Sequence, residues 1–397
     1  MQIEQYLSNF DLDVRKSKDA RFMDQKCTPD VVCIIADCVV NFIGNDYSKK
    51  FTVRDIWNSQ YFIKNVKEIF NKPLATNPTT QSEYDKFIQQ PLRMLAYARI
   101  LNFNRIGTTN VYTVANYEIL EYISLKDKNA YLFLYQYLEK VLTDSGIYKH
   151  FEKYNNLFII NKLDDNAFDF LKEKFQRFIL GNTNITGVVE INRIFPKILN
   201  IYACKNNLPG TIRGALSTHE FYYPDLMYNR KNWRDIKKDK NVSRQEAEYD
   251  ILTDEIESPY NEYLIQKAMN QIRRMYSQSE VNDKLSNAEA TQVHHIFPKY
   301  EFPQIAHYLE NLIKLTASQH YTMAHPSNKT HGINVDYQLV CLLAKSDSIE
   351  KSLRKHEVYY RKESFIHCIN TGLKVDLKSD LSYRQIKKEL ATIYNNS

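Results

Sequence analysis

Glycine is scarce in this chain, which has only 9 glycines among 397 residues. Folds that bind nucleotides through phosphate-cradling loops need glycines at fixed spacing, and neither GxGxxG nor GxxxxGK[ST] occurs in the sequence. We therefore expect no nucleotide cofactor. A chain of this length exceeds what one hydrophobic core usually supports, so two or three domains are expected.

The composition is that of a soluble globular protein, with 43% hydrophobic and 25% charged residues. The six cysteines contain no CxxC pair, which predicts reduced, buried thiols and argues against a zinc or disulfide framework. The first residues show no basic region followed by an apolar core, so we expect no signal peptide, and no apolar run approaches the ~20 residues of a membrane span. We expect a cytoplasmic protein. Its net charge of +6 suits a partner that carries phosphates.

The first 115 residues combine predicted helices with a predicted hairpin. Residues 30–43 and 51–57 are predicted helices, the second with Thr52 as its N-cap. Pro91 is predicted to open a third helix. Two β-prone stretches in residues 101–114 flank a glycine and predict a hairpin. This order is typical of a winged helix-turn-helix domain, which we place at residues 1–115. A helical scaffold domain is the alternative.

In a winged helix, the third helix enters the DNA groove and the hairpin lies along the backbone. Arginine suits guanine and glutamine suits adenine, which makes side chains on or beside the third helix candidates for reading bases. These candidates are Gln89, Gln90, Arg93 and Arg99, and Arg105 of the hairpin would meet phosphate or the minor groove. Taken singly, each is also typical of a solvated surface.

Residues 116–180 show helical apolar spacing and predict a linker bundle. The stretch "GNTNITG" (181–187) marks the predicted boundary to a domain of residues 181–397, which ends in predicted helices. Residues 228–244 carry a local charge of +5 and could track a phosphate backbone, although a solvated helix face is the alternative. The DNA-contact candidates in this stretch are Arg230, Lys231, Arg234, Lys237 and Lys238.

Two adjacent histidines stand in "QVHHIFPK" (292–299), at the end of an apolar run. Successive side chains of a strand point to opposite faces, so His294 and His295 are expected to have different tasks. A second strand is predicted at 311–315, with Asn311 at its start. Thr316 and Gln319 then form a capping-box pattern that predicts a helix. The predicted order is strand, loop, strand, helix, with His320 on the helix.

Residues 288–330 resemble the ββα-metal finger of HNH endonucleases in the order and spacing of these elements. The resemblance implies that His294 and His320 are metal ligands and that His295 is the general base for the attacking water. It implies that Asn311 holds the loop that orients His295. A structural module with surface histidines is the alternative.

One departure from the colicin-type pattern concerns the third histidine. The position four residues after His320 is Ala324, and the histidine is His325. In an α-helix, five residues turn about 140°, but Pro326 disfavours helical geometry at His325 and could turn it back toward the metal. A phosphate contact or plain exposure is the alternative. With two protein ligands, Mg²⁺ or Mn²⁺ is expected, one ion per site. Lys299 is a further phosphate-contact candidate.

The sequence around the finger resembles, more loosely, bacterial type II restriction endonucleases of the HNH class. We therefore expect a mainly helical α+β protein that acts on double-stranded DNA as a sequence-specific, metal-dependent endonuclease. One HNH site cuts one strand, so a double-strand cut requires a homodimer or sequential nicking. The alternatives are an HNH nuclease with a modification-dependent, homing or nicking role, and a non-catalytic DNA-binding regulator.

Overall fold

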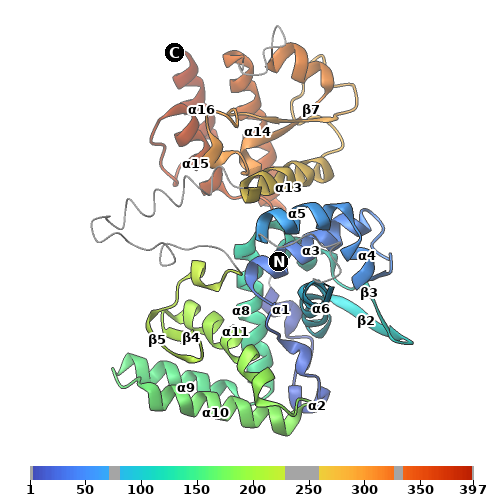
Figure 1. The fold of residues 1–397 in the computed structure, drawn as a ribbon. Helices are drawn as coiled ribbons and strands as arrows, with labels where there is room; N and C mark the ends of the chain where they lie inside the picture. The colour runs from blue at the N-terminus through green and yellow to red at the C-terminus, as the bar shows by residue number, and fades with distance from the viewer. Residues whose placement is uncertain (1–2, 71–80, 229–258, 326–333, 396–397) are drawn as a thin grey trace. The chain divides into compact units, whose positions relative to one another are not determined.

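The computed structural model describes residues 3–70, 81–228, 259–325 and 334–395 (Figure 1). The protein is mainly helical, with small antiparallel sheets, as the sequence predicts. The chain divides into two compact units, Gln2–Lys240 and Asn241–Ser397. The predicted division at residues 115 and 180 stays a prediction. Helices on both sides of residue 115 pack together, because α3 (Pro29–Ile43) contacts α7 (Tyr117–Leu125) and α8 (Asp127–Asp144).

The first half of the unit Gln2–Lys240 contains the predicted helices and hairpin. Helix α3 is buried along almost its whole length. Thr52 caps the short helix α4 (Val53–Trp57) through a capping box with Asp55, so this predicted N-cap is confirmed. The other elements here are α1 (Ile3–Leu7), α2 (Val14–Ser17), β1 (Phe51–Thr52), α5 (Gln60–Phe70), α6 (Gln81–Tyr97), β2 (Leu101–Ile106) and β3 (Thr109–Val114).

The predicted start of the third helix at Pro91 is wrong. Helix α6 begins at Gln81, and Pro91 lies inside it. A proline inside a helix removes one backbone hydrogen bond, but packing can offset that cost. Here the buried residues continue at helical spacing on both sides of the proline: Tyr84, Phe87, Ile88, Leu92 and Leu95. The apolar face of α6 is therefore unbroken.

The hairpin predicted at residues 101–114 is confirmed. Strands β2 and β3 pair antiparallel, and Gly107 in their turn has a φ of +60°. Strand β1, which the sequence analysis did not predict, pairs with β3, so the sheet order is β1-β3-β2. Figure 1 shows the hairpin extending beyond α6.

The second half of this unit is a helical layer with a further hairpin. The helices predicted within residues 116–180 correspond to α7, α8 and α10 (Asp165–Asn182), with α9 (Tyr148–Ile159) between them. Helix α11 (Val188–Asn206) packs on α10, and Phe195 contacts Phe168 and Phe175. Strands β4 (Pro209–Ile212) and β5 (Ala215–Glu220) form the hairpin.

The unit Asn241–Ser397 is built around a two-stranded sheet. Strands β6 (Gln292–His295) and β7 (Leu312–Leu315) pair antiparallel, and a short helix follows β7. The predicted order of strand, loop, strand and helix is therefore present. Helices α13 (Pro259–Met275), α14 (Val335–Arg354), α15 (Lys362–Leu373) and α16 (Tyr383–Asn395) complete the unit.

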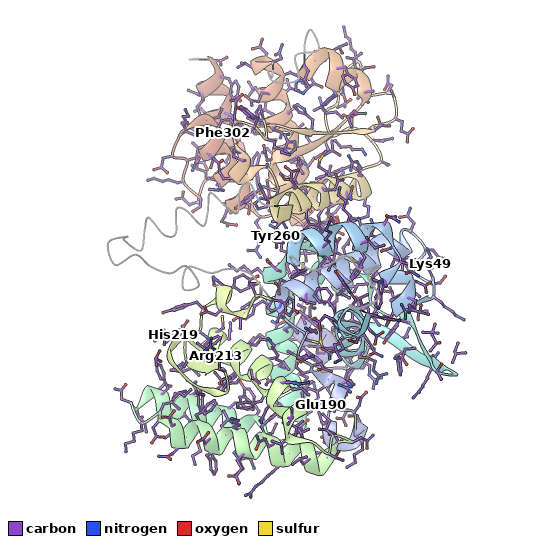
Figure 2. The ribbon with its side chains drawn as sticks, viewed as in Figure 1. Lys49, Glu190, Arg213, His219, Tyr260 and Phe302 are labelled. Atoms are coloured by element: carbon purple, nitrogen blue, oxygen red, sulfur yellow. The ribbon has the colours of Figure 1, made fainter. Side chains whose placement is uncertain are left out.

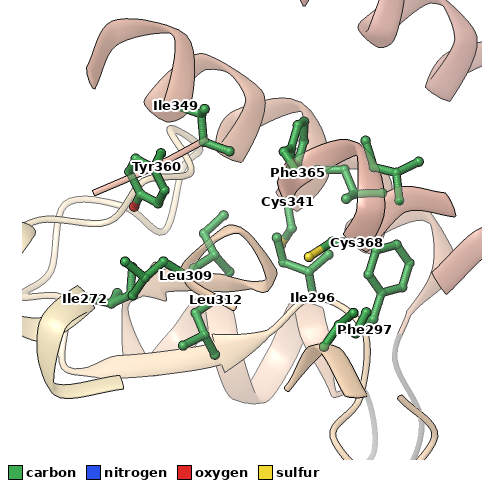
Figure 3. Close-up of a cluster of buried hydrophobic side chains, with 14 of the residues drawn as sticks. Ile272, Ile296, Phe297, Leu309, Leu312, Cys341, Ile349, Tyr360, Phe365 and Cys368 are labelled. Atoms are coloured by element: carbon green, nitrogen blue, oxygen red, sulfur yellow. The ribbon is translucent and has the colours of Figure 1, made fainter. Parts of the chain in front are cut away.

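The core of this unit lies between the sheet and these helices (Figure 3). Ile296 and Phe297, which leave β6, pack beside Cys368 of α15. A Cβ atom on Gly372 would lie 2.3 Å from the ring of Phe297, so glycine is required for α15 to approach the exit of β6 this closely. All six cysteines are free thiols, and five of them are buried.

A buried ion pair joins this sheet to α14. The ammonium of Lys345 lies 2.7 Å from the Glu280 carboxylate, and both side chains are 0% exposed. Glu280 also accepts the backbone N–H of Lys314 in β7 at 2.9 Å. Lys345 further donates to the hydroxyl of Tyr360 at 3.2 Å. The carboxylate therefore has partners on both a helix and a strand.

Within the described ranges, no helix combines the length and the apolar character needed to cross a membrane.

Candidate metal and catalytic centre

The two adjacent histidines point to different surroundings, as the sequence predicts for a strand. His294 pairs with Ile313 and His295 with Leu312 across the β6–β7 ladder. His294 is 4% exposed and faces the helix that follows β7. His295 is half-buried and contacts the loop between the strands instead. Strand geometry therefore gives each ring its own environment.

Three histidines from two elements meet on the inner side of the sheet. The rings of His294, His320 and His325 lie 4.9–5.2 Å apart between centroids. One nitrogen from each ring falls within a set whose members are at most 4.8 Å apart. Nitrogen ligands on one tetrahedral ion are about 3.4 Å apart at metal–nitrogen distances of about 2.1 Å. Small ring movements would therefore close this group on a metal.

The short helix after β7 is a π-helix over Gln319–Ala324, which explains how His325 joins the group. The N–H of His325 donates to the carbonyl of His320 at 3.1 Å, a five-residue step. In an α-helix, residues three and four apart share a face, whereas the wider π-turn brings residues five apart together. The structure thus brings the third histidine, whose role the sequence left open, beside His294 and His320.

Gln319 fixes the start of this helix. Its side chain accepts the N–H of Thr316 at 3.0 Å, and the hydroxyl of Thr316 accepts the N–H of Gln319 at 3.1 Å, so the predicted capping box is present. The amide of Gln319 also donates to the carbonyl of Val281 and to Asp283. The capping pattern predicts the role of Gln319 as a cap, but no local pattern predicts this second set of contacts, because residues 281–283 lie far away in sequence.

The electrostatics of the group favour metal binding. Burial lowers the pKa of His294 well below its ordinary value, and the neighbouring His320 and His325 rings lower it further. Burial and His325 also lower the pKa of His320. Both rings are therefore neutral at pH 7, the form that ligates a metal. Nε2 of His294 and Nδ1 of His320 are buried and have no hydrogen-bond partner among the described residues. Such atoms usually have a partner, and an ion would supply one.

His295 is held by a backbone carbonyl. Its Nε2 lies 3.0 Å from the carbonyl oxygen of Ala306. A carbonyl can only accept, so Nε2 carries the proton of the neutral ring and Nδ1 carries the lone pair. Burial lowers the pKa of His295, and the Ala306 hydrogen bond partly opposes this shift. The ring is thus neutral near pH 7 and can accept a proton at Nδ1.

Asn311 ties down the loop that carries the Ala306 carbonyl. It is fully buried, and its Oδ1 accepts the N–H of Phe297 at 2.8 Å. Its amide donates to the carbonyls of Phe297 at 3.1 Å and Ile305 at 3.3 Å. Residues on both ends of the loop are therefore bound by one side chain.

Lys299 lies near His295 but is already paired. Its ammonium is 2.5 Å from Glu262 of α13, and both side chains are substantially exposed. An exposed ion pair is worth little and opens readily, so Lys299 stays available to a phosphate. Lys299 also lowers the pKa of His295, whereas Glu262 raises it.

The predicted base-reading residues have different environments in the unit Gln2–Lys240. Gln90 accepts the backbone N–H of Lys26 at 2.9 Å. Arg93 donates to Asp19 at 2.8 Å and stacks over the ring of Phe103. Gln89 is half-buried and has no such partner among the described residues.

The remaining candidates lie at or beyond the end of α6. Arg99 is exposed, with a φ of +63°, and its carbonyl accepts the hydroxyl of Tyr6. Arg105 is exposed on β2. The candidates Arg230, Lys231, Arg234, Lys237 and Lys238 lie outside the described residues.

No protein-family model, curated protein or solved structure matches the chain.

Proposed function

We propose that this protein is a divalent-metal-dependent DNA endonuclease of the HNH type that acts as a sequence-specific restriction enzyme. The observation that carries the proposal is the placement of His294 and His295 on opposite faces of β6. One ring joins a three-histidine group suited to a metal, and the other is held with Nδ1 as its basic nitrogen. A metal site next to an oriented general base is what hydrolysis of a phosphodiester requires.

Each residue then has a separate task. Nδ1 of His295 takes the proton of the attacking water, and Ala306 and Asn311 keep the ring in position. His294, His320 and His325 would hold the metal. A metal bound there supplies charge stabilisation at the scissile phosphate and at the leaving 3′ oxygen. The products are 5′-phosphate and 3′-hydroxyl ends.

The ligand set bears on which metal is used. Three imidazoles, with no carboxylate in the group among the described residues, favour an ion that accepts nitrogen. Mg²⁺ prefers oxygen ligands, so Mn²⁺ or Zn²⁺ suits this set better. The sequence-based expectation of Mg²⁺ or Mn²⁺, in preference to zinc, assumed two protein ligands. Catalytic zinc sites commonly have three protein ligands and one open position, which matches the group here. We propose one Mn²⁺ or Zn²⁺ ion per site.

The unit Gln2–Lys240 would recognise the DNA. A winged helix has a helix, a short strand, further helices and a hairpin, with the first strand pairing to the last. The order α3, β1, α4, α5, α6, β2, β3 and the sheet order β1-β3-β2 support that topology. Helix α6 would be the recognition helix and the β2–β3 hairpin would be the wing.

The direct experiment is cleavage of plasmid DNA by the purified full chain, with Mn²⁺, Zn²⁺ or Mg²⁺, and with EDTA. We expect EDTA-sensitive cleavage into discrete bands. His295→Ala should lower the rate by about 10²–10⁴-fold and still bind metal, because only the base is lost. Sequencing the cut ends gives the site. Absence of cleavage with every metal, or near-normal cleavage by His295→Ala, would contradict the proposal, and a smear would contradict the sequence-specific part.

A further inference from the structure

A groove in the unit Gln2–Lys240 runs between α6, the β2–β3 hairpin and the start of α11, with a volume of about 900 Å³. Its remaining wall comes from the segment around Arg21 and Asp24. Glu190, labelled in Figure 2, marks the α11 side. The groove is mainly polar. The charged side chains that line it are Arg21, Asp24, Asp85, Lys86, Arg93, Arg105, Glu190 and Arg193.

Several of these groups are satisfied within the protein. Arg21 forms ion pairs with Asp24 at 2.6 Å and with Glu190 at 3.1 Å, so both of these carboxylates are neutralised within the protein. Arg93 is paired with Asp19. Together with the bond from the Lys26 N–H to Gln90, these contacts build the walls of the groove. The Arg93–Asp19 pair, with side chains 19% and 32% exposed, is more buried than the Lys299–Glu262 pair, so it opens less readily and Arg93 helps to shape the groove.

Several lining side chains have donors that lack a partner among the described residues. Lys86, Gln89, Arg105 and Arg193 make no side-chain hydrogen bond or ion pair among the described residues. Three of them are cations, opposed only by the carboxylate of Asp85 among the unpaired lining groups. The groove therefore presents a surplus of free positive charge from three separate elements.

The hairpin side of the groove is exposed, because Arg105 and residues 106–109 are exposed to solvent. A long polyanion can extend along such an exposed wall, whereas a small anion would gain most from an enclosed site. Cations spaced along a groove match the repeated phosphates of a nucleic acid backbone.

We propose that this groove is the surface that holds duplex DNA, with Lys86, Arg105 and Arg193 on phosphates and Gln89 on a base edge. The inference rests on the proposed function, since it names how the endonuclease would grip its substrate. It adds α11, which the sequence analysis assigned to the nuclease domain, to the DNA-binding surface. It also makes Gln90 and Arg93 positioning residues of the groove rather than base readers.

The test measures binding of a labelled random-sequence duplex by fluorescence anisotropy over a range of salt, in the full chain carrying His295→Ala. Lys86→Ala, Arg105→Ala and Arg193→Ala should each weaken binding several-fold. Each should also reduce the slope of log affinity against log salt by about 0.9, the effect of one lost phosphate contact. Lys162→Ala removes an exposed cation outside the groove and should change neither quantity. Gln89→Ala should weaken only duplexes that the unsubstituted chain prefers.

Binding of duplex by the three variants with unchanged affinity and slope would overturn the groove assignment and leave the endonuclease proposal standing. Binding of a mononucleotide as tightly as the duplex would also overturn it, because the groove would then hold a small anion. If the chain with native His295 neither binds nor cleaves DNA, the proposed function fails and the groove assignment fails with it. Circular dichroism of each variant checks that a loss of binding is not a loss of folding.

Discussion

The backbone N–H of His325 donates to the carbonyl oxygen of His320 at 3.1 Å. This five-residue step is the π-turn that brings the ring of His325 beside the rings of His320 and His294. The consequence is a site of three imidazoles in place of two, and it determines how each histidine should respond to substitution.

We expect His320→Ala and His325→Ala to raise the metal concentration needed for half-maximal cleavage to a similar extent, by at least about tenfold. Each variant removes one of three ligands from the same group. A titration with Mn²⁺ measures this, and His356→Asn, which removes an exposed histidine outside the group, is the control. If His325→Ala needs no more metal than the unsubstituted protein, the site has two protein ligands.

Deleting Thr322 should preserve metal binding better than removing His325. The deletion restores the four-residue spacing that an ordinary α-helix places on one face. Thr322 is exposed, so the deletion removes no buried side chain. Isothermal titration calorimetry with Zn²⁺ should show weaker binding by His325→Ala than by the deletion variant. The matched control inserts one alanine after Thr322 and should bind metal poorly. Equal affinities of the deletion and insertion variants would exclude a role for the π-turn.

Asn311→Ala should lower both stability and the rate of cleavage. The variant leaves the buried N–H of Phe297 without its 2.8 Å acceptor, which costs about 1–3 kcal/mol. The Ile305–Ala306 peptide then loses its anchor, so the His295 ring is held less firmly. Urea unfolding gives the first quantity and single-turnover cleavage the second. Metal affinity should change little, and a large loss of metal affinity would place Asn311 in the metal site instead.

The metal-free protein should be less stable in mild acid. Burial lowers the pKa of His294 below its ordinary 6.5, so the folded state binds fewer protons than the unfolded chain just below that pH. The contribution of neutral His294 to the free energy of unfolding is complete above pH 6.5 and is lost as the pH falls below it. Urea unfolding in EDTA on both sides of pH 6.5 measures this loss. His294→Asn should flatten the dependence, and an unchanged slope in that variant would assign it to other groups.

Local sequence patterns predicted those features of the site that depend only on residues close together in the sequence. Strand alternation separated His294 from His295, and the Thr316–Gln319 pair located the helix start. The π-turn could not be predicted, because the one extra residue in this helical turn depends on anchors, which are hydrogen bonds to residues distant in the sequence. These anchors are the contacts of Gln319 with residues 281–283 and the bond from the Asn334 N–H to the Ala324 carbonyl.

Dependence on long-range contacts also limited what the sequence could predict for α6. The sequence gives Gln90 and Arg93 the residue types of base readers, but their partners Lys26 and Asp19 lie more than 60 residues away. The predicted helix start at Pro91 was wrong for a related reason, because the buried residues Phe87 and Leu92 on either side of the proline stabilise the helix through it. Sequence-local rules describe what a side chain is able to do, and long-range packing decides whether it is free to do it.

The buried pair of Lys345 and Glu280 has a consequence for protein engineering. Glu280 lies upstream of the ββα segment and Lys345 downstream of it, and the carboxylate also holds the N–H of Lys314 inside it. A fragment cut at residues 288 and 330 would leave that strand without its carboxylate acceptor. Transferring the proposed catalytic segment to a different protein therefore requires a fragment that extends from before Glu280 to beyond Lys345, because a shorter one would lack this buried ion pair.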